Sequence, residues 1–303
     1  MSDSGHIDDF ESHPAFTVCA PAQQRVPFIF NTPHSGRVYP SSFFAASGLT
    51  PQALRRSEDV MVDELFASVV EIGAPLLAAQ FPRAWLDVNR EPLELDPQLF
   101  RQRLPAHANS RSMRVVGGLG TIPRLVSENM LIYETPPTLE EGLTRIDRIY
   151  RPYHAALRNM FEDTLEQFGH AVLVDCHSMP SRGGRKEKAP RPDVVIGDRY
   201  GTSCAGEITS ELAQRFGDLG YSVARNKPYA GGFITENYGR PLRGYHAVQI
   251  ELNRGVYMNE TTLEMLPRFD QLRDDIRKVV GHLVSVPDGS FGPFESIFPL
   301  AAE

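Results

Sequence analysis

The chain has 303 residues and a formal net charge of -7, with 41% hydrophobic and 23% charged residues. This composition is ordinary for a folded protein, and the length suits one large α/β domain or two small ones. The acidic balance argues against a nucleic-acid partner. No apolar run reaches the length of a membrane span, and the N-terminus lacks a signal-peptide apolar region, so we expect a cytoplasmic protein with no membrane partner.

Strand-like runs alternate with helix-like periods along the chain. Strands are predicted over residues 26–34, one or two within 74–90, and then over 170–178, 193–198, 221–229 and 246–254. Helices are predicted over 57–73, 138–168, 203–220 and 261–286. The alternation favours an α/β sandwich around a mixed, mostly parallel central sheet.

Capping signals mark the ends of several predicted helices. Ser57 is the expected N-cap of the first helix and Gly73 its end, while Gly169 closes the second helix. Residues 91–137 and 226–245 are rich in Gly, Pro and Arg, and they are long for plain connections. We therefore interpret them as functional loops beside a site.

We divide the chain into one domain and two tails. The expected domain spans residues 21–287, with tails over 1–20 and 288–303. The three cysteines are too few and too scattered for a disulfide framework or a cysteine-rich zinc site. They are more simply explained as small buried apolar residues.

Two histidines end strongly apolar predicted strands, and each is followed by serine. They are His34 and His177. Ligands bind beyond the carboxyl ends of strands in open α/β sheets, and two histidines with one carboxylate form a common catalytic zinc set. Glu58 or Asp59 would supply the oxygen, although acidic residues at a helix start are also routine. The coincidence of the two histidines favours a metal site.

Glu251 lies near the end of the last predicted strand. Alternation within VQIELNR (248–254) places it on the face opposite the apolar residues. A carboxylate in a core strand is costly unless it is paired or functional. It is either a general base beside a metal site or the ion-pair partner of Arg254 or Arg243, and the sequence leaves both open.

Asn89, Arg90 and Arg124 are candidates for anion recognition. Arginine holds a carboxylate with two parallel hydrogen bonds, which lysine cannot do. Most single arginines form surface ion pairs of little consequence. For Arg90 we favour anion recognition over a surface ion pair, because Arg90 follows Asp-x-Asn at a predicted strand end.

Eight short segments, taken together in order, resemble the N-formylglutamate amidohydrolase family, which is related to zinc carboxypeptidases and aspartoacylase-like deacylases. The resemblance covers roughly residues 25–285. The segments are PHSG (33–36), SEDVMVDELF (57–66), PRAWLDVNREP (82–92), GLGTIPR (118–124), RPYHAAL (151–157), DCHSMPS (175–181), GGFITENYG (231–239) and HAVQIELNRGVYM (246–258).

The resemblance implies a phosphorylase/hydrolase-like, three-layer α/β/α fold and a zinc-dependent amidohydrolase. The implied reaction converts N-formyl-L-glutamate, or a similar small N-acyl amino acid, to the free amino acid and formate, late in bacterial histidine breakdown. The implied zinc ligands are His34, His177 and either Asp59 or Glu58. Ser35-Gly36-Arg37 follows His34, so the carboxypeptidase-like His-x-x-Glu spacing is absent and does not identify the third ligand. Of the two carboxylates we favour Asp59.

The same resemblance assigns roles to residues around the metal. Glu251 matches the catalytic glutamate, which would take a proton from a zinc-activated water molecule. Asn89 and Arg90 match the pair that grips the substrate carboxylate. Arg124 or Arg182 would hold a second, side-chain carboxylate of this anionic small molecule.

Two other functions remain open at this point. One is a deacylase or amidase for a different N-acyl amino acid or small peptide. The other is a non-catalytic protein that binds a ligand on the same scaffold, which would be expected to lack a metal ligand or the base. Both histidines and Glu251 are present.

Overall fold

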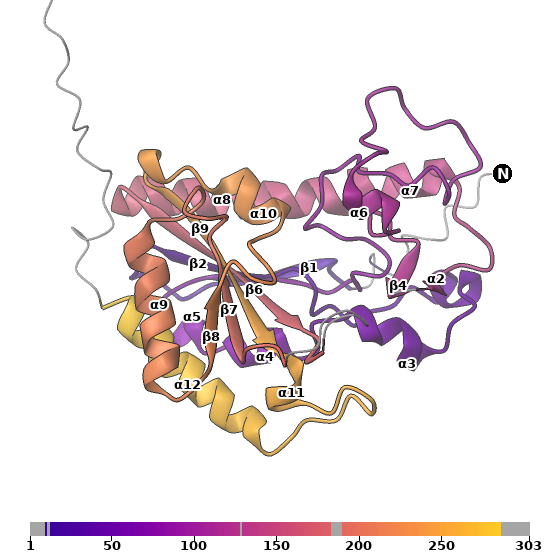
Figure 1. Cartoon of the computed structure of the whole chain (residues 1–303). Helices are drawn as coiled ribbons and strands as arrows, with labels where there is room; N and C mark the ends of the chain where they lie inside the picture. The colour runs from indigo at the N-terminus through magenta and orange to yellow at the C-terminus, as the bar shows by residue number, and fades with distance from the viewer. Residues whose placement is uncertain (1–9, 11–12, 128, 183–189, 286–303) are drawn as a thin grey trace, which may run out of the picture.

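The computed structural model of the chain describes residue 10 and residues 13–127, 129–182 and 190–285. At its centre is a seven-stranded sheet with the order β1-β3-β2-β6-β9-β7-β8 (Figure 1). The strands of this sheet are β1 (Phe16–Cys19), β2 (Phe28–Thr32), β3 (Leu76–Ala79), β6 (Ala171–Met179), β7 (Val194–Gly197), β8 (Val223–Arg225) and β9 (Tyr245–Asn253). A small separate sheet pairs β4 (Leu125–Ser127) with β5 (Met130–Leu131).

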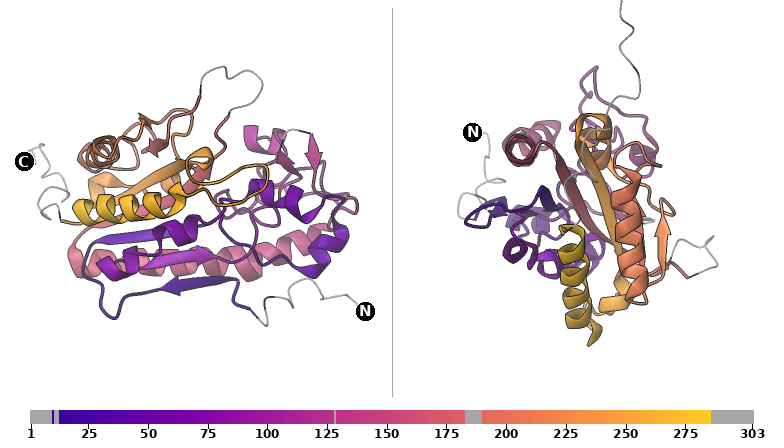
Figure 2. Two further views of the ribbon diagram at one scale, coloured as in Figure 1. Left: turned by 90° about the horizontal axis from the view of Figure 1, so that it is seen from below. Right: turned by 90° about the vertical axis from the view of Figure 1, so that its left-hand side faces the viewer.

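Helices cover both faces of the large sheet. The helical segments are α2 (Ser41–Ala46), α3 (Pro51–Leu54), η1 (Arg55–Ser57), α4 (Val62–Phe66), α5 (Val69–Ile72), α6 (Met113–Val116), α7 (Leu139–Arg145), η2 (Ile146–Tyr150), α8 (Arg151–Phe168), α9 (Gly206–Asp218), α10 (Phe233–Tyr238), η3 (Pro241–Arg243), α11 (Arg254–Tyr257) and α12 (Arg268–Leu283). Residues of α4, α5, α9 and α12 contribute to the core on one face of the sheet, and residues of α8 and α10 to the core on the other. Figure 2 shows helices on both sides of the sheet. The fold is therefore a three-layer α/β/α sandwich.

The strand directions confirm a mixed, mostly parallel sheet. β2 pairs in parallel with both β3 and β6, β6 with β9, and β7 with β8. The antiparallel pairs are β1 with β3 and β7 with β9. All nine residues of β6 are buried, as expected for a central parallel strand covered on both faces. No helix in the described ranges is long and apolar enough to cross a membrane.

The predicted helix over 57–73 is wrong at its start and in its continuity. The helix begins only at Val62 and is divided into α4 and α5, and the N-cap position is Met61 in the left-handed region (φ 60°). Ser57 instead donates its hydroxyl to the carbonyl of Leu54. The Asp59 backbone N–H binds the carbonyl of His34 at 3.0 Å, which holds this segment in a non-helical turn. The predicted end at Gly73 is confirmed.

Other differences concern the edges of predicted elements. Residues 74–90 contain one strand, β3, which is within the expected one or two. The rest forms turns in which the Trp85 N–H binds the carbonyl of Pro82. The expected tail over residues 1–20 contains β1. Four residues of β1 pair with β3 at the edge of the sheet. The predicted tail over 288–303 lies outside the described residues.

The two long predicted helices are largely confirmed. The first begins at Thr138, whose side chain forms a capping box with Glu141, and it ends at Gly169 with φ 77°. A π-helical turn, η2, separates its two α-helical parts. The last helix starts at Arg268 rather than at residue 261, because Pro267 favours a helix start and not an interior position.

We expect Gly36→Ala to destabilise the protein. A Cβ at this position would overlap the backbone carbonyl of Phe81, and the neighbouring strand end cannot move without shifting β3. Overpacking of this kind costs roughly 1–3 kcal/mol or more of unfolding free energy. The measurement is chemical denaturation.

The matched control is Gly206→Ala, in the first turn of α9, where an added Cβ meets nothing within 4 Å. Equal unfolding free energies for the two variants would contradict the close approach at Gly36.

Candidate active site

His34 and His177 come together because β2 and β6 pair in parallel. Asn31 in β2 lies opposite Asp175 in β6, so the residues that follow lie at the same edge of the sheet. The two imidazoles approach with their Nδ1 atoms 3.1 Å apart. Both side chains are buried.

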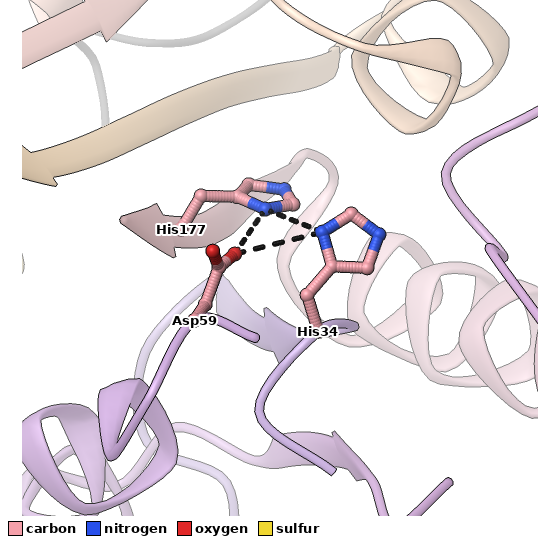
Figure 3. A group of neighbouring side chains, drawn as sticks. All are labelled: His34, Asp59 and His177. Atoms are coloured by element: carbon pink, nitrogen blue, oxygen red, sulfur yellow. Dashed lines mark hydrogen bonds and ion pairs between the residues drawn. The ribbon is translucent and has the colours of Figure 1, made fainter. Parts of the chain in front are cut away.

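Asp59 completes a triad with these histidines (Figure 3). Its Oδ2 lies 2.9 Å from Nδ1 of His177 and 3.5 Å from Nδ1 of His34. Ligands held about 2.0–2.1 Å from a tetrahedral zinc ion lie roughly 3.3 Å apart. The three donor atoms are therefore spaced as the ligands of one metal ion would be, and they include two imidazole nitrogens and one carboxylate oxygen.

Both histidines present Nδ1 because their other ring nitrogens are occupied. Nε2 of His34 lies 2.7 Å from Oδ1 of Asp87, and Nε2 of His177 lies 2.8 Å from Oδ2 of Asp175. Asp175 in turn accepts a hydrogen bond from Asn31 at 2.8 Å. Carboxylates placed behind histidine ligands set the tautomer and ring orientation in metal sites.

Asp59 of the triad and Asp87 behind His34 are both held in their charged form. Burial alone would raise the pKa of Asp59, but hydrogen bonds from His177 and His34 hold it well below its ordinary value. Burial also opposes ionisation of Asp87, while the charges of Arg90, His34 and Arg83 hold its pKa well below the usual range. Deprotonated carboxylates are the form that ligates or supports a metal.

The second oxygen of Asp59 is already bound. Its Oδ1 accepts from Nη2 of Arg254 at 3.0 Å and from the hydroxyl of Ser178 at 3.2 Å. Only Oδ2 then faces the histidines. Glu58 points elsewhere, since it accepts hydrogen bonds from Tyr39 at 2.5 Å and Arg55 at 3.0 Å.

A cavity of about 470 Å³ opens onto the triad. Its walls include His34, His177, Asn89, Arg90, Glu251 and Arg254, and the loops over 91–137 and 226–245 contribute residues 114–127 and 228–232 in part. The interpretation of these loops as walls of a site therefore agrees with the structure.

Glu251 is buried in this cavity without a charged partner among the residues that the structure describes. It lies opposite His177 in the β6–β9 register, and its Oε1 accepts from Gln249 at 2.8 Å. Arg254 pairs with Asp59 instead. Burial raises the pKa of Glu251 to about 7. A glutamate in this state can exchange a proton near neutral pH.

The other residues singled out in the sequence lie in different surroundings. Asn89 accepts from the backbone N–H of Ile234, and its amide lies 3.2 Å from Nε2 of His177. Arg90 lines the cavity and donates to two backbone carbonyls. Arg124 pairs with Asp96 at 2.7 Å and does not line the cavity, and Arg182 is exposed and does not line it either.

Sequence reasoning missed two arginines of the site. Arg83 donates to Oδ2 of Asp87 at 2.9 Å and lines the cavity. Arg254 holds Asp59, and we had considered it only as a partner of Glu251. Arg83 stands four residues before Asp87, and this spacing is the sequence feature that could have predicted their ion pair.

The fold and the site define a hydrolase type of centre, with a buried His-Asp-His triad that could hold a metal ion, carboxylates behind both histidines and a buried acid in the same cavity. The model of the N-formylglutamate amidohydrolase family matches residues 26–258, and the chain belongs to this family of amidohydrolases.

Known proteins of this family resemble the chain over most of its length. The N-formylglutamate deformylase of Pseudomonas putida is 30% identical, with 79% of this chain and 84% of that protein covered. That of Pseudomonas aeruginosa is 28% identical, with 78% and 84% covered. The crystal structure of N-formylglutamate amidohydrolase from Ralstonia eutropha is 34% identical, has a TM-score of 0.84, and covers 89% of this chain and 98% of that one.

We expect Asp59→Asn to weaken metal binding strongly and Glu58→Gln to leave it unchanged. Only the Asp59 carboxylate faces both imidazoles, whereas the neighbouring Glu58 is equally buried but faces Tyr39 and Arg55. The loss should exceed the roughly 10- to 100-fold typical of removing an outer partner of a metal ligand.

Calorimetric titration of zinc into metal-free protein measures both variants. Weaker binding in Glu58→Gln, with Asp59→Asn unaffected, would assign the third ligand to Glu58 instead.

Proposed function

We propose that the protein hydrolyses N-formyl-L-glutamate, or a similar N-acyl amino acid, to the free amino acid and formate. The observation that carries this proposal is Glu251, a buried acid without a charged partner in the described structure, in the cavity that opens onto the triad. Membership of the amidohydrolase family and the deformylases among its relatives support it. We further propose that the reaction belongs to histidine degradation and takes place in the cytoplasm.

Zinc is the ion that we propose for the triad. Two imidazole nitrogens and one carboxylate oxygen are a frequent donor set of catalytic zinc, and their spacing of 2.9–3.5 Å suits tetrahedral coordination. When bound, zinc would polarise the amide carbonyl and lower the pKa of water. Arg254 and Ser178 bind the other oxygen of Asp59, so this carboxylate offers one ligand atom and leaves room for reactants.

Glu251 is the general base in this proposal. Burial raises its pKa to about 7, so it accepts a proton from water and returns it to the departing amine without a large energy difference. Gln249 donates to Oε1 and thereby orients the carboxylate. His246 is another residue of β9 that could act as a base, but it lies opposite Val172 at the far end of the strand, where its ring accepts from the Ala205 N–H.

Arg90 is the proposed partner of the substrate α-carboxylate. Its Nε donates to the carbonyl of Leu119 and its Nη1 to that of Asn89, so the guanidinium is fixed in the cavity wall. Nη2 lies 3.4 Å from Asp87 and retains donor capacity. Asn89 would help to hold this arrangement through its contacts with His177 and Ile234, in addition to any contact with the substrate.

A formate-release assay over N-formyl amino acids, with acetate release from the matching N-acetyl compounds, tests the function. The expected result is turnover of N-formyl-L-glutamate that stops after chelation and returns with zinc. Turnover of another N-acyl amino acid alone would make the protein a different deacylase. Ligand binding without turnover by the zinc-loaded protein would make it a binding protein.

We expect Glu251→Gln to lower kcat by on the order of 10²-fold or more. The amide keeps the shape of the side chain but cannot take a proton, so zinc content and KM should change little. Kinetics, metal analysis and thermal melting on one preparation distinguish the loss of a base from the loss of zinc or of folded protein.

Glu58→Gln is the control, because Glu58 is a buried glutamate outside the cavity. Normal kcat in folded, zinc-loaded Glu251→Gln would remove this residue from the mechanism.

We expect Arg90→Lys to raise KM by about 10-fold or more for every substrate with a free α-carboxylate. A lysine ammonium cannot keep both carbonyl contacts and still bind a carboxylate, and a hydrogen bond to a charged group contributes about 1.5–3 kcal/mol. Steady-state kinetics and a melting curve are needed together. A lower melting temperature with unchanged KM would mean that Arg90 serves only to hold the loop around Leu119.

A further inference from the structure

Five arginines line the cavity in a chain whose net charge is -7. They are Arg56, Arg83, Arg90, Arg114 and Arg254. The acidic residues that line it are Asp87 and Glu251. A cavity with this excess of positive charge concentrates anions against the overall charge of the protein.

Three of these arginines are held by the site itself. Arg83 donates to Asp87 at 2.9 Å, and Arg254 to Asp59 at 3.0 Å. Arg90 donates to two backbone carbonyls and lies 3.4 Å from Asp87. Their charges are matched largely by the carboxylates that surround the triad.

Arg56 and Arg114 differ from these three arginines in their exposure and in their ion pairs. Arg56 is exposed, and the described part of the chain offers it no ion pair. Arg114 is 35% exposed, and its nearest carboxylate oxygen, Oε2 of Glu94, is 3.9 Å away, beyond hydrogen-bonding distance. Both line the cavity and are accessible to solvent. Their guanidinium groups are thus available to an anion in the cavity.

Part of the cavity wall is apolar. Leu119, Pro123, Leu125 and Val126 line the cavity in the same loop that carries Arg114. An apolar wall that leads to guanidinium groups suits a short methylene chain that ends in a carboxylate.

We propose that Arg56 and Arg114 are specificity-determining residues that bind the side-chain carboxylate of a dicarboxylic N-acyl amino acid. This inference rests on the proposed function and identifies how that site selects its substrate. It replaces the expectation that Arg124 or Arg182 has this role, because neither lines the cavity and Arg124 is bound to Asp96.

The test compares N-formyl-L-glutamate with N-formyl-L-glutamine, which has nearly the same shape and no side-chain charge. The zinc-loaded full chain is assayed as wild type, Arg56→Gln and Arg114→Gln. For each variant kcat/KM should fall by on the order of 10- to 100-fold with the glutamate substrate and stay unchanged with the glutamine substrate. The matched control is Arg111→Gln, which alters an exposed arginine three residues before Arg114 that does not line the cavity.

Two kinetic outcomes would overturn the inference while leaving the proposed function intact. Equal losses with both substrates would mean that these arginines serve the α-carboxylate or the fold. An equal loss in Arg111→Gln would mean that only the general charge of the surface matters.

Failure of the wild type to hydrolyse either compound would refute the hydrolysis of N-formyl-L-glutamate in the proposed function. Calorimetric binding of L-glutamate and L-glutamine then tests the arginines without turnover. Preferential binding of glutamate that is lost in Arg56→Gln and Arg114→Gln supports their role, and an unchanged preference overturns it.

Discussion

The site depends on the pairing of each buried imidazole with a carboxylate behind it. His34 with Asp87, and His177 with Asp175, direct both Nδ1 atoms toward one point. Two imidazoles 3.1 Å apart in a buried environment would be unfavourable if both were protonated, and the nearby carboxylates compensate this cost. The parallel register of β2 and β6 makes the arrangement possible, because the backbone pairing alone brings the two strand ends together.

Asp59, the carboxylate of the triad, is held by a single arginine that connects separate parts of the fold. Arg254 follows β9 directly, and it binds Asp59, the hydroxyl of Ser178 at the end of β6 and the backbone carbonyl of Arg56. A buried guanidinium with most of its donors used is stable only in one geometry. It therefore holds the segment of residues 56–59 against the sheet, and that segment carries both a triad residue and a cavity arginine.

Much of the centre was predictable from sequence, and the limits have physical causes. His34, His177 and Glu251 follow from strand periodicity, because polar residues at the ends of apolar strands meet at one edge. Asp59 could not be separated from Glu58 by residue type, since the decision rests on the Asp59 N–H bond to His34 and on Tyr39 and Arg55. Arg124 and Arg182 do not line the cavity. The sequence could not show this, because neither residue lies in a segment with clear strand or helix periodicity.

The residues that we propose for the reaction lie on strands or at strand ends, whereas those that we propose for substrate selection lie on short segments outside the sheet. The triad histidines and Glu251 lie on or directly after β2, β6 and β9, which are packed on both faces and tolerate little change. Arg56 and Arg114 lie instead on η1 and α6, two short segments at the solvent side of the cavity. A change in these rim residues alters the charge that a substrate meets without moving a strand. Relatives with the same strand-borne centre but different rim arginines would therefore be expected to share the reaction and differ in the amino acid that they release.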